Sequence, residues 1–475
     1  MLNPTMEPEK PASSLKQKAL WGLGGFSENL ANNALSSLAY PIFGVGMGIS
    51  PFWIGLSQSI SRVVEVVTDP IMGNMTDHTR SRWGRRRPWI FVGAILMSLM
   101  FTAVWFTPRY HQGQYSSIIY LVLMTSLFYS AFTLWNIPYS GLGLELETDY
   151  NERTKLMIFR VTPSFIVGIA IGSLYKLTLM KNVWHGDEVI GARWVCSIVA
   201  VFMLVTGIIP AIFCRERFVQ PEHHEKLNMW RSMALTFQDK SFLLLIGSAF
   251  FVFVGLFFMI PLLTYISLYH CCQGSKDLMA TIGMYTAPVQ AATQILSMFA
   301  IGYLGKRFDK KVILIAGLLI GILGYASSWF LFTPRHPYLT ILPPVIINIG
   351  LCACWVLNGS FNCDICDYDE LKTGRRREGM YSAVFAFLTK LAIAFVMTVS
   401  SWVLVKLGFE GQDLHPTAQQ LFTLRWFYIA VPVAAMSLAI ICMWRYPLTR
   451  ERVSEIQAEL KKKKAEAAAA PMATA

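Results

Sequence analysis

Three charged residues lie within an otherwise apolar run of the sequence. Arg62, Glu65 and Asp69 are separated by three and four residues, which places them on one face of a helix. Charged groups at membrane depth cost several kcal/mol or more, so they normally face a helix-bundle interior or a watery cavity. A structural or snorkelling ion pair is the alternative, but Arg62 would neutralise only one of the two carboxylates. The pattern therefore predicts part of an ion or substrate pathway.

Arg160 and Lys390 also lie inside apolar segments. A buried lysine must either pair with an anion or lose its proton. Each residue has two possible roles: it binds or couples ligands, or it forms a structural bridge between helices.

The elements that must position these charges are membrane helices. The chain has 475 residues, of which 54% are hydrophobic and only 15% are charged, and soluble domains average about 25% charged residues. A spanning helix needs roughly 20 mainly apolar residues. This criterion predicts an all-α membrane protein with twelve spans, at 20–46, 51–75, 88–107, 117–143, 157–179, 193–214, 241–270, 279–304, 312–333, 338–363, 380–407 and 423–445.

The distribution of positive charge predicts the orientation. Most of the 41 Lys and Arg residues fall in the two terminal segments and the even-numbered loops, which places both termini in the cytoplasm. The polar N-terminus is not typical of a cleavable signal peptide. We interpret the net charge of +12 as this bias plus a solvated tail near anionic lipid, and we expect no nucleic-acid partner.

Two features recur in the two halves of the chain. A glycine-containing helix end runs into a basic turn after the second and the eighth span, and an acidic-Tyr-acidic pattern follows the fourth and the tenth. This predicts two six-helix repeats, the plan of major facilitator transporters. The expected segments are a cytoplasmic N-tail (1–18), a first bundle (19–214), a linker (215–240), a second bundle (241–446) and a basic, Ala-rich cytoplasmic tail (447–475).

The recurring loops suggest a cytoplasmic latch between helix ends. In this interpretation glycine allows close helix approach, while charged side chains bridge neighbouring helices; the alternative is that the arginines only enforce topology. The candidate latch residues are Gly73, Asp77, Arg80, Arg85, Arg86, Arg87, Asp364, Asp367 and Arg376.

Specific motifs resemble the glycoside-pentoside-hexuronide:cation symporters, whose type member is the melibiose permease. The likeness extends from the first helix to the last. The motifs are DPIMG (69–73), TRSRWGRRRPW (79–89), NIPY (136–139), Arg160, WVLN (355–358), DICDY (364–368), GRRREGMYSA (374–383) and Lys390.

The resemblance implies a cation site. It assigns Glu65 and Asp69 to this site, together with Thr133 and Asn136, and it places Lys390 near their carboxylates. Asn136 stands where the type member has an aspartate. Because Na⁺ needs several oxygen ligands and a proton needs one titratable group, H⁺ is slightly favoured over Na⁺. We expect no other cofactor, and no metal.

The resemblance also implies a sugar site. Asn29 occupies the position of an acid on the first helix, with Glu28 as a possible stand-in one residue earlier, and Asn136, Arg160 and Trp355 complete the set. Arginine and carboxylate suit vicinal hydroxyls, and an indole suits a pyranose face. The loss of acids relative to a galactoside permease leads to the hypothesis that an anionic uronide is tolerated.

The prediction is a bacterial inner-membrane symporter that couples H⁺ or Na⁺ influx to uptake of a sugar or glycoside, with a monomer sufficient for function. The alternatives are a symporter for lysophospholipid-type lipids on the same fold and a non-transporting membrane sensor. An enzyme is not expected, because the sequence has no phosphate-binding loop or nucleophile-base motif. The pair Cys363 and Cys366 lacks the further ligands that a zinc site requires.

Overall fold

The computed structural model describes residues 14–111, 115–146, 150–214, 216, 239–374, 377–411 and 414–469. Internal contacts divide the chain into two compact units. Unit 1 comprises Met1–Ile49 and Ile60–His223, and unit 2 comprises Ser50–Ser59 and His224–Ala475. The predicted linker 215–240 lies outside the described residues except for Glu216, Asp239 and Lys240, and the predicted domain limits stay predictions.

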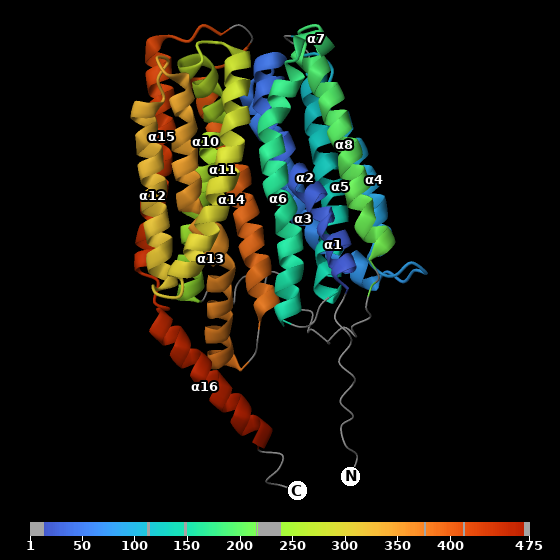
Figure 1. Cartoon of the computed structure of the whole chain (residues 1–475), viewed down its shortest axis with the longest axis vertical. Helices are drawn as coiled ribbons and strands as arrows, with labels where there is room; N and C mark the ends of the chain where they lie inside the picture. The colour runs from blue at the N-terminus through green and yellow to red at the C-terminus, as the bar shows by residue number, and fades with distance from the viewer. Residues whose placement is uncertain are drawn as a thin grey trace. The chain divides into compact units, whose positions relative to one another are not determined.

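The described secondary-structure elements of unit 1 are all helices (Figure 1). A short helix α1 leads into α2, which ends in a π-helical turn, η1; α3 starts at residues counted with unit 2. The bounds are α1 Leu15–Gly22, α2 Gly24–Ala39, η1 Tyr40–Gly46, α3 Pro51–His78, α4 Arg87–Trp105, α5 Ser116–Leu146, α6 Tyr150–Thr178, α7 Lys181–Trp184 and α8 Glu188–Phe213.

Unit 2 repeats this design. Its first long helix also ends in a π-helical turn, η2, and a further helix, α16, follows the last long one. The bounds are α10 Lys240–Tyr265, η2 Ile266–Cys271, α11 Lys276–Leu304, α12 Lys310–Leu331, η3 Pro337–Ile341, α13 Leu342–Thr373, α14 Glu378–Lys406, α15 Ala418–Trp444 and α16 Arg450–Ala469.

Helix packing supports the predicted duplication. In unit 1, α2 packs against α6 and α8, and α4 packs against α5 and α8. In unit 2, α10 packs against α14 and α15, and α12 packs against α13 and α15. The two patterns coincide when α2, α4, α5, α6 and α8 are matched in order with α10, α12, α13, α14 and α15.

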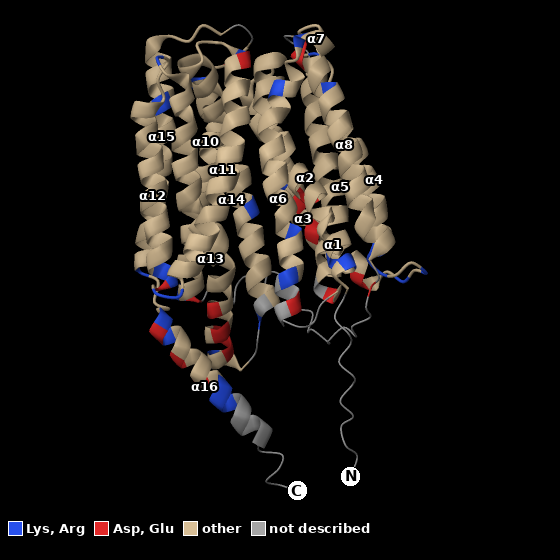
Figure 2. Ribbon diagram, in the orientation of Figure 1, with Lys and Arg blue, Asp and Glu red and all other residues tan. Residues whose placement is uncertain are grey.

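Helices lie at all twelve predicted positions. Among the described residues, nine helices are long and apolar enough to cross a membrane: α4, α5, α6, α8, α10, α12, α13, α14 and α15. For α2, α3 and α11, membrane crossing stays a prediction. The charged residues Arg62, Glu65 and Asp69 lower the mean hydropathy of α3. Figure 2 shows charged residues mostly at helix ends and few along the helix middles.

Aspartate and hydroxyl side chains define where several helices begin. Asp187 accepts hydrogen bonds from the backbone N–H groups of Val189 and Ile190 at the start of α8. Asp239 and Asp309 do the same for α10 and α12. These caps satisfy N–H groups that a helix leaves without internal partners.

Part of the predicted tail is helical. Residues Arg450–Ala469 form α16, which packs against α13 and buries the side chains of Ile456 and Leu460, while most of its other described side chains are exposed. Apolar residues four positions apart share one helix face, so this basic helix also has a side that can leave water.

Candidate functional site

One face of α5 organises the buried polar groups of unit 1. Tyr129, Thr133, Asn136 and Ser140 follow one another at intervals of four, three and four residues, so they lie in a row along the helix. Side chains from α3 and α6 contact this row, and Glu28 of α2 is linked to it through Arg160.

At one end of the row, Arg62 of α3 is held by two groups. Its Nη1 donates to Glu65 Oε2 at 2.8 Å, and its guanidinium carbon lies 4.5 Å from the centre of the Tyr129 ring. The side chains of Arg62 and Glu65 are only 11% and 4% exposed. The predicted charges on α3 therefore do face the protein interior, and Glu65 is already neutralised by Arg62.

The next contact along α5 involves the second carboxylate of α3. The Thr133 hydroxyl donates to Asp69 Oδ1 at 3.0 Å. One turn further, the buried Asn136 Oδ1 has no hydrogen-bond partner among the described residues. A buried acceptor left without a donor is costly, so Asn136 is suited to a ligand that brings a positive charge or a hydrogen.

At the other end of the row, Arg160 of α6 forms the strongest polar contact of the site. Its Nε donates to Glu28 Oε2 at 2.8 Å, and its Nη2 donates to Glu28 Oε1 at 2.6 Å and to Ser140 Oγ at 3.0 Å. Two-point contact fixes both the position and the plane of the guanidinium. About a fifth of each charged side chain stays exposed, 22% for Arg160 and 18% for Glu28, so a ligand can reach the pair.

Two aromatic rings line this ion pair. The Arg160 guanidinium carbon lies 5.8 Å from the Trp21 ring centre and 5.5 Å from that of Tyr139. The two rings stack with centroids 5.1 Å apart, and each donates a hydrogen bond to the other residue's carbonyl oxygen. Both side chains are buried, so they hold Arg160 rather than present a free ring to a ligand.

Asn29 does not meet Arg160. Its amide donates to Ser164 Oγ at 2.7 Å and to the Gly25 carbonyl at 2.9 Å. Successive residues of a helix point about 100° apart, so Glu28 and Asn29 face different neighbours. The structure thus brings Glu28, and not Asn29, into contact with Arg160.

The sequence reasoning missed several residues of this site. Tyr129 and Trp21 were not identified, although Tyr129 lies one turn before Thr133 on the same face. Trp135 is buried, and its indole N–H donates to the Gly207 carbonyl at 3.0 Å, so it packs α5 against α8.

The unit 1 latch residues come together at one end of the bundle. Arg85 and Arg86 both pair with Glu145 at the end of α5, with Arg86 Nη2 3.0 Å from Glu145 Oε1. Each also lies 3.8 Å from Asp77 at the end of α3. The basic turn therefore connects the ends of three helices.

Glu216 joins the same cluster and was not predicted. Its carboxylate accepts hydrogen bonds of 2.6–2.9 Å from the backbone N–H groups of Arg85, Arg86 and Arg87. The Arg87 side chain donates to the Ala211 and Ile212 carbonyls at the end of α8. The Glu216 carboxylate thus caps the N-terminus of α4, and the Arg87 side chain caps the C-terminus of α8.

Two other latch predictions find less support. A Cβ at Gly73 would meet no described atom within 4 Å, so the expected close helix approach is not seen there. Arg80 is exposed, and Arg376 lies outside the described residues.

The unit 2 latch residues contact the C-terminal part of the chain. Asp364 is buried and accepts two hydrogen bonds from Lys310 Nζ, at 2.8 and 3.0 Å. Asp367 accepts from Gln457 of α16 at 3.1 Å. Their shared role within this unit is to join α13 to the start of α12 and to α16.

The remaining site residues also lie in unit 2. Lys390 is half-buried on α14, and its link to the carboxylates of α3 stays a prediction. Trp355 lies on α13 with 54% of its surface exposed and packs against Phe253 of α10. No group of three or more His, Cys, Asp or Glu side chains suited to a metal occurs within the described ranges.

Known proteins are similar to this chain in sequence over most of its length and in fold. The chain is 26% identical to the "Putative glycoside/cation symporter YagG" of Escherichia coli (strain K12), with 95% of this chain and 96% of the relative covered. It is 23% identical to the "Glucuronide carrier protein homolog" of the same organism, covering 94% and 95%. The crystal structure of a D-xylose-proton symporter superposes with a TM-score of 0.62 at 14% identity, over 92% of this chain and 98% of that one, which shows a shared fold. Residues 20–450 match the family described as MFS/sugar transport protein, and the chain belongs to that family.

Proposed function

We propose that this protein is a secondary active symporter that couples inward flux of a cation, H⁺ or Na⁺, to uptake of a sugar or glycoside by alternating access. The observation that carries the proposal is the row on α5. It joins a carboxylate site, Asp69 with Thr133, to a bidentate arginine site, Arg160 with Glu28, within one unit. A coupled transporter needs two ligand sites whose occupancies affect each other.

The arginine site suits a neutral sugar. Vicinal hydroxyls can accept from the guanidinium and donate to a carboxylate, and both groups are held here in a fixed geometry. Because Glu28 balances the charge of Arg160, the pair weakens our hypothesis of an anionic uronide, although the name of one relative refers to a glucuronide.

The carboxylate site favours a proton over Na⁺. Arg62 brings a positive charge to Glu65, and the carboxylate of Asp69 has one hydroxyl and one amide oxygen nearby along α5. Sodium is bound best where several oxygens and enough charge converge, whereas a proton needs one basic group.

We also propose a cellular location and an orientation for the protein. We infer a bacterial inner membrane with both termini in the cytoplasm, and no enzymatic activity. A transported lipid is the alternative substrate. The bidentate pair of Arg160 and Glu28, with the Ser140 hydroxyl beside it, favours a substrate that carries several hydroxyl groups.

The experiment is uptake by the purified protein in proteoliposomes. A panel of labelled sugars and glycosides, a hexuronate and a lysophospholipid is offered under an imposed H⁺ or Na⁺ gradient. We expect a sugar or glycoside to accumulate only with a gradient, and a protonophore to abolish accumulation if H⁺ is the coupling ion.

Variants make the test specific. Asp69→Asn is expected to abolish gradient-driven accumulation, and the exposed Asp277→Asn is the matched control that keeps it. Equal accumulation by Asp69→Asn would contradict the cation site, and accumulation of the lysophospholipid alone would replace the sugar by a lipid.

A further inference from the structure

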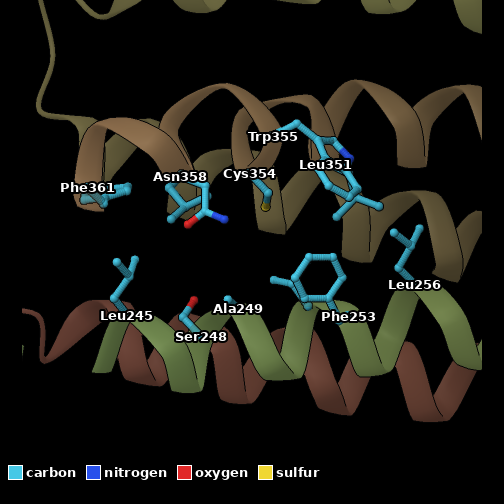
Figure 3. Close-up of a pocket in the computed structure, with 12 residues that line it drawn as sticks. Leu245, Ser248, Ala249, Phe253, Leu256, Leu351, Cys354, Trp355, Asn358 and Phe361 are labelled. Carbon is cyan, nitrogen blue, oxygen red and sulfur yellow. The ribbon is translucent and has the colours of Figure 1, made fainter. Parts of the chain in front are cut away.

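Unit 2 has an apolar groove between α10 and α14, away from the site residues described above. Its empty volume is about 740 Å³. The face of α10 that carries Leu245, Ala249 and Phe253 points toward α13 instead (Figure 3). The groove therefore uses another face of α10. Its lining residues are Leu243, Ile246, Gly247, Phe250, Leu388, Thr389, Leu391, Ala392 and Phe395.

The lining offers no polar group to an occupant. Of the nine described residues that form it, only Thr389 has a polar side chain. Its hydroxyl donates to the carbonyl oxygens of Phe385 and Ala386 on its own helix, at 2.9 and 3.0 Å. A hydroxylated ligand would lose its hydrogen bonds to water in this groove without replacement. The occupant must therefore be apolar along its whole length.

The position of the groove identifies the source of that apolar group. Both helices belong to segments that are long and apolar enough to cross a membrane. Leu243 is 40% exposed, Phe250 38% and Phe395 65%. Lys390 is not in the lining, although the residues on both sides of it are. Apolar surface at this depth, away from the charge of α14, meets the hydrocarbon of the bilayer, so a lipid acyl chain is the occupant that fits.

Gly247 keeps the floor of the groove open. A Cβ at this position would meet only Cys442 Sγ, at the ordinary contact distance of 3.6 Å. Close packing of helices therefore does not require a glycine here, and a glycine in a helix interior is less stable than an alanine. Its effect is to leave space that a larger side chain would fill.

A lysine lies at one end of the groove. Lys240, Leu243, Gly247 and Phe250 follow one another at intervals of three, four and three residues, so they share one face of α10. Lys240 is the first residue of the helix and is exposed. A lipid whose chain lies along this face would bring its phosphate to the ammonium group.

The start of α10 adds to this positive charge. A helix N-terminus carries a partial positive charge from its backbone N–H groups. The carboxylate of Asp239 precedes Lys240, but it accepts hydrogen bonds from the N–H groups of Ser241 and Phe242 at 2.8 and 3.4 Å. The lysine at the end of an apolar groove therefore complements an anionic headgroup better than a zwitterionic one.

We propose that the groove between α10 and α14 is a binding site for an anionic phospholipid, with one acyl chain in the groove and the phosphate at Lys240. The lipid joins the two helices from the membrane side. With the proposed orientation, it belongs to the inner leaflet. The inference goes beyond the proposed transport and does not depend on which substrate is carried.

Native mass spectrometry of the full-length protein, stripped of lipid in detergent, tests the headgroup. Dioleoylphosphatidylglycerol and dioleoylphosphatidylcholine have the same chains and differ in net charge. We expect the first bound phosphatidylglycerol to have an affinity about fivefold higher than that of phosphatidylcholine, the size of effect expected from one lysine near a lipid surface. Equal affinities would overturn the anionic part of the proposal.

Two variants locate the lipid. Lys240→Gln is expected to remove the preference for phosphatidylglycerol, while Lys181→Gln, at the exposed start of α7, keeps it. Gly247→Leu fills the floor and should weaken binding of both lipids. Its control is Gly302→Leu on α11, where a Cβ would meet no described atom within 4 Å. A preference that persists in Lys240→Gln contradicts the proposal.

Photolabelling of the unaltered protein gives the same answer without relying on a variant that folds. Phosphatidylglycerol with a diazirine in one acyl chain is mixed into phosphatidylcholine liposomes that contain the protein, and labelled peptides are mapped after irradiation. We expect labelling to concentrate on α10 between 243 and 250 and on α14 between 388 and 395. Labelling spread evenly over the lipid-exposed helices would overturn the site.

Discussion

Arg160 and Glu28 form a two-point ion pair between α6 and α2, with N–O distances of 2.8 and 2.6 Å. Ser140 of α5 takes a third hydrogen bond from the same guanidinium at 3.0 Å. The pair therefore joins three helices of unit 1 at one buried point, and it keeps enough exposure to contact a ligand.

Arg160→Lys is expected to weaken sugar binding at least about tenfold, because an ammonium group cannot reproduce the planar two-point contact. Glu28→Gln should cause a similar loss. Counterflow exchange in proteoliposomes measures this without an ion gradient. Arg109→Lys, in an exposed Arg–Asp pair, is the matched control. Wild-type affinity in both site variants would contradict a role of the pair in sugar binding.

Removing Arg62 is expected to destabilise the protein. In Arg62→Gln, the carboxylate of Glu65 stays buried without its guanidinium, which costs on the order of 3 kcal/mol. The double variant with Glu65→Gln should recover part of this loss. Thermal unfolding in detergent provides the measurement.

The control for Arg62 is Arg452→Gln on α16. Arg452 and Glu455 are also three residues apart, and their N–O distance of 2.7 Å is close to that of the Arg62–Glu65 pair. Both side chains, however, are about half exposed or more. Exposed pairs contribute about 0–1 kcal/mol, so this variant should unfold close to wild type. Equal effects of the two substitutions would show that Arg62 and Glu65 are not buried in the native protein.

Asn136→Asp is expected to increase the response of transport to Na⁺. It adds a carboxylate beside the Thr133–Asp69 contact, at an atom that lacks a hydrogen-bond partner in the described structure. More oxygen charge favours a hard cation over a proton. Uptake is measured under separate H⁺ and Na⁺ gradients, with the exposed Asn33→Asp as control; an unchanged ion preference would remove Asn136 from the cation site.

Gly84→Ala is expected to destabilise unit 1 more than Gly186→Ala. Both glycines have positive φ angles, +111° and +84°, but a Cβ at Gly84 would also lie 2.6 Å from the carboxylate of Glu216, while one at Gly186 would meet no described atom within 4 Å. Glu216→Ala should cost about 1–2 kcal/mol by uncapping α4. The melting temperatures of Gly84→Ala, Gly186→Ala and Glu216→Ala are compared. Equal losses of stability in the two glycine variants would exclude the Glu216 contact as a source of stability.

The orientation can be tested with two exposed positions. The variant Arg82→Cys places a cysteine in the basic turn between α3 and α4, and Asn182→Cys places one in α7. We expect a membrane-impermeant maleimide to label Asn182→Cys in intact cells and Arg82→Cys only after the membrane is opened, each relative to the parent protein. The reverse pattern would place the termini on the outer side.

The class of protein and the helices that carry the charges could both be predicted from the amino-acid sequence. Apolar segments of spanning length are recognisable because the bilayer imposes a minimum length, and Arg62, Glu65, Asp69 and Arg160 stand out because hydrocarbon cannot solvate them. The family motifs were also visible in the chain, and the family match confirms them. The duplication was predicted from recurring loops, and the packing of the helices supports it.

Which of these residues contact one another depends on how the helices pack. Neighbouring residues on a helix point about 100° apart, so sequence alone could not show that Glu28 contacts Arg160 while Asn29 contacts Ser164. The contacts of Glu216 with the basic turn join segments that are far apart in the chain. Such contacts leave no periodic signal, because they are set by how helices pack and not by the spacing within any one of them.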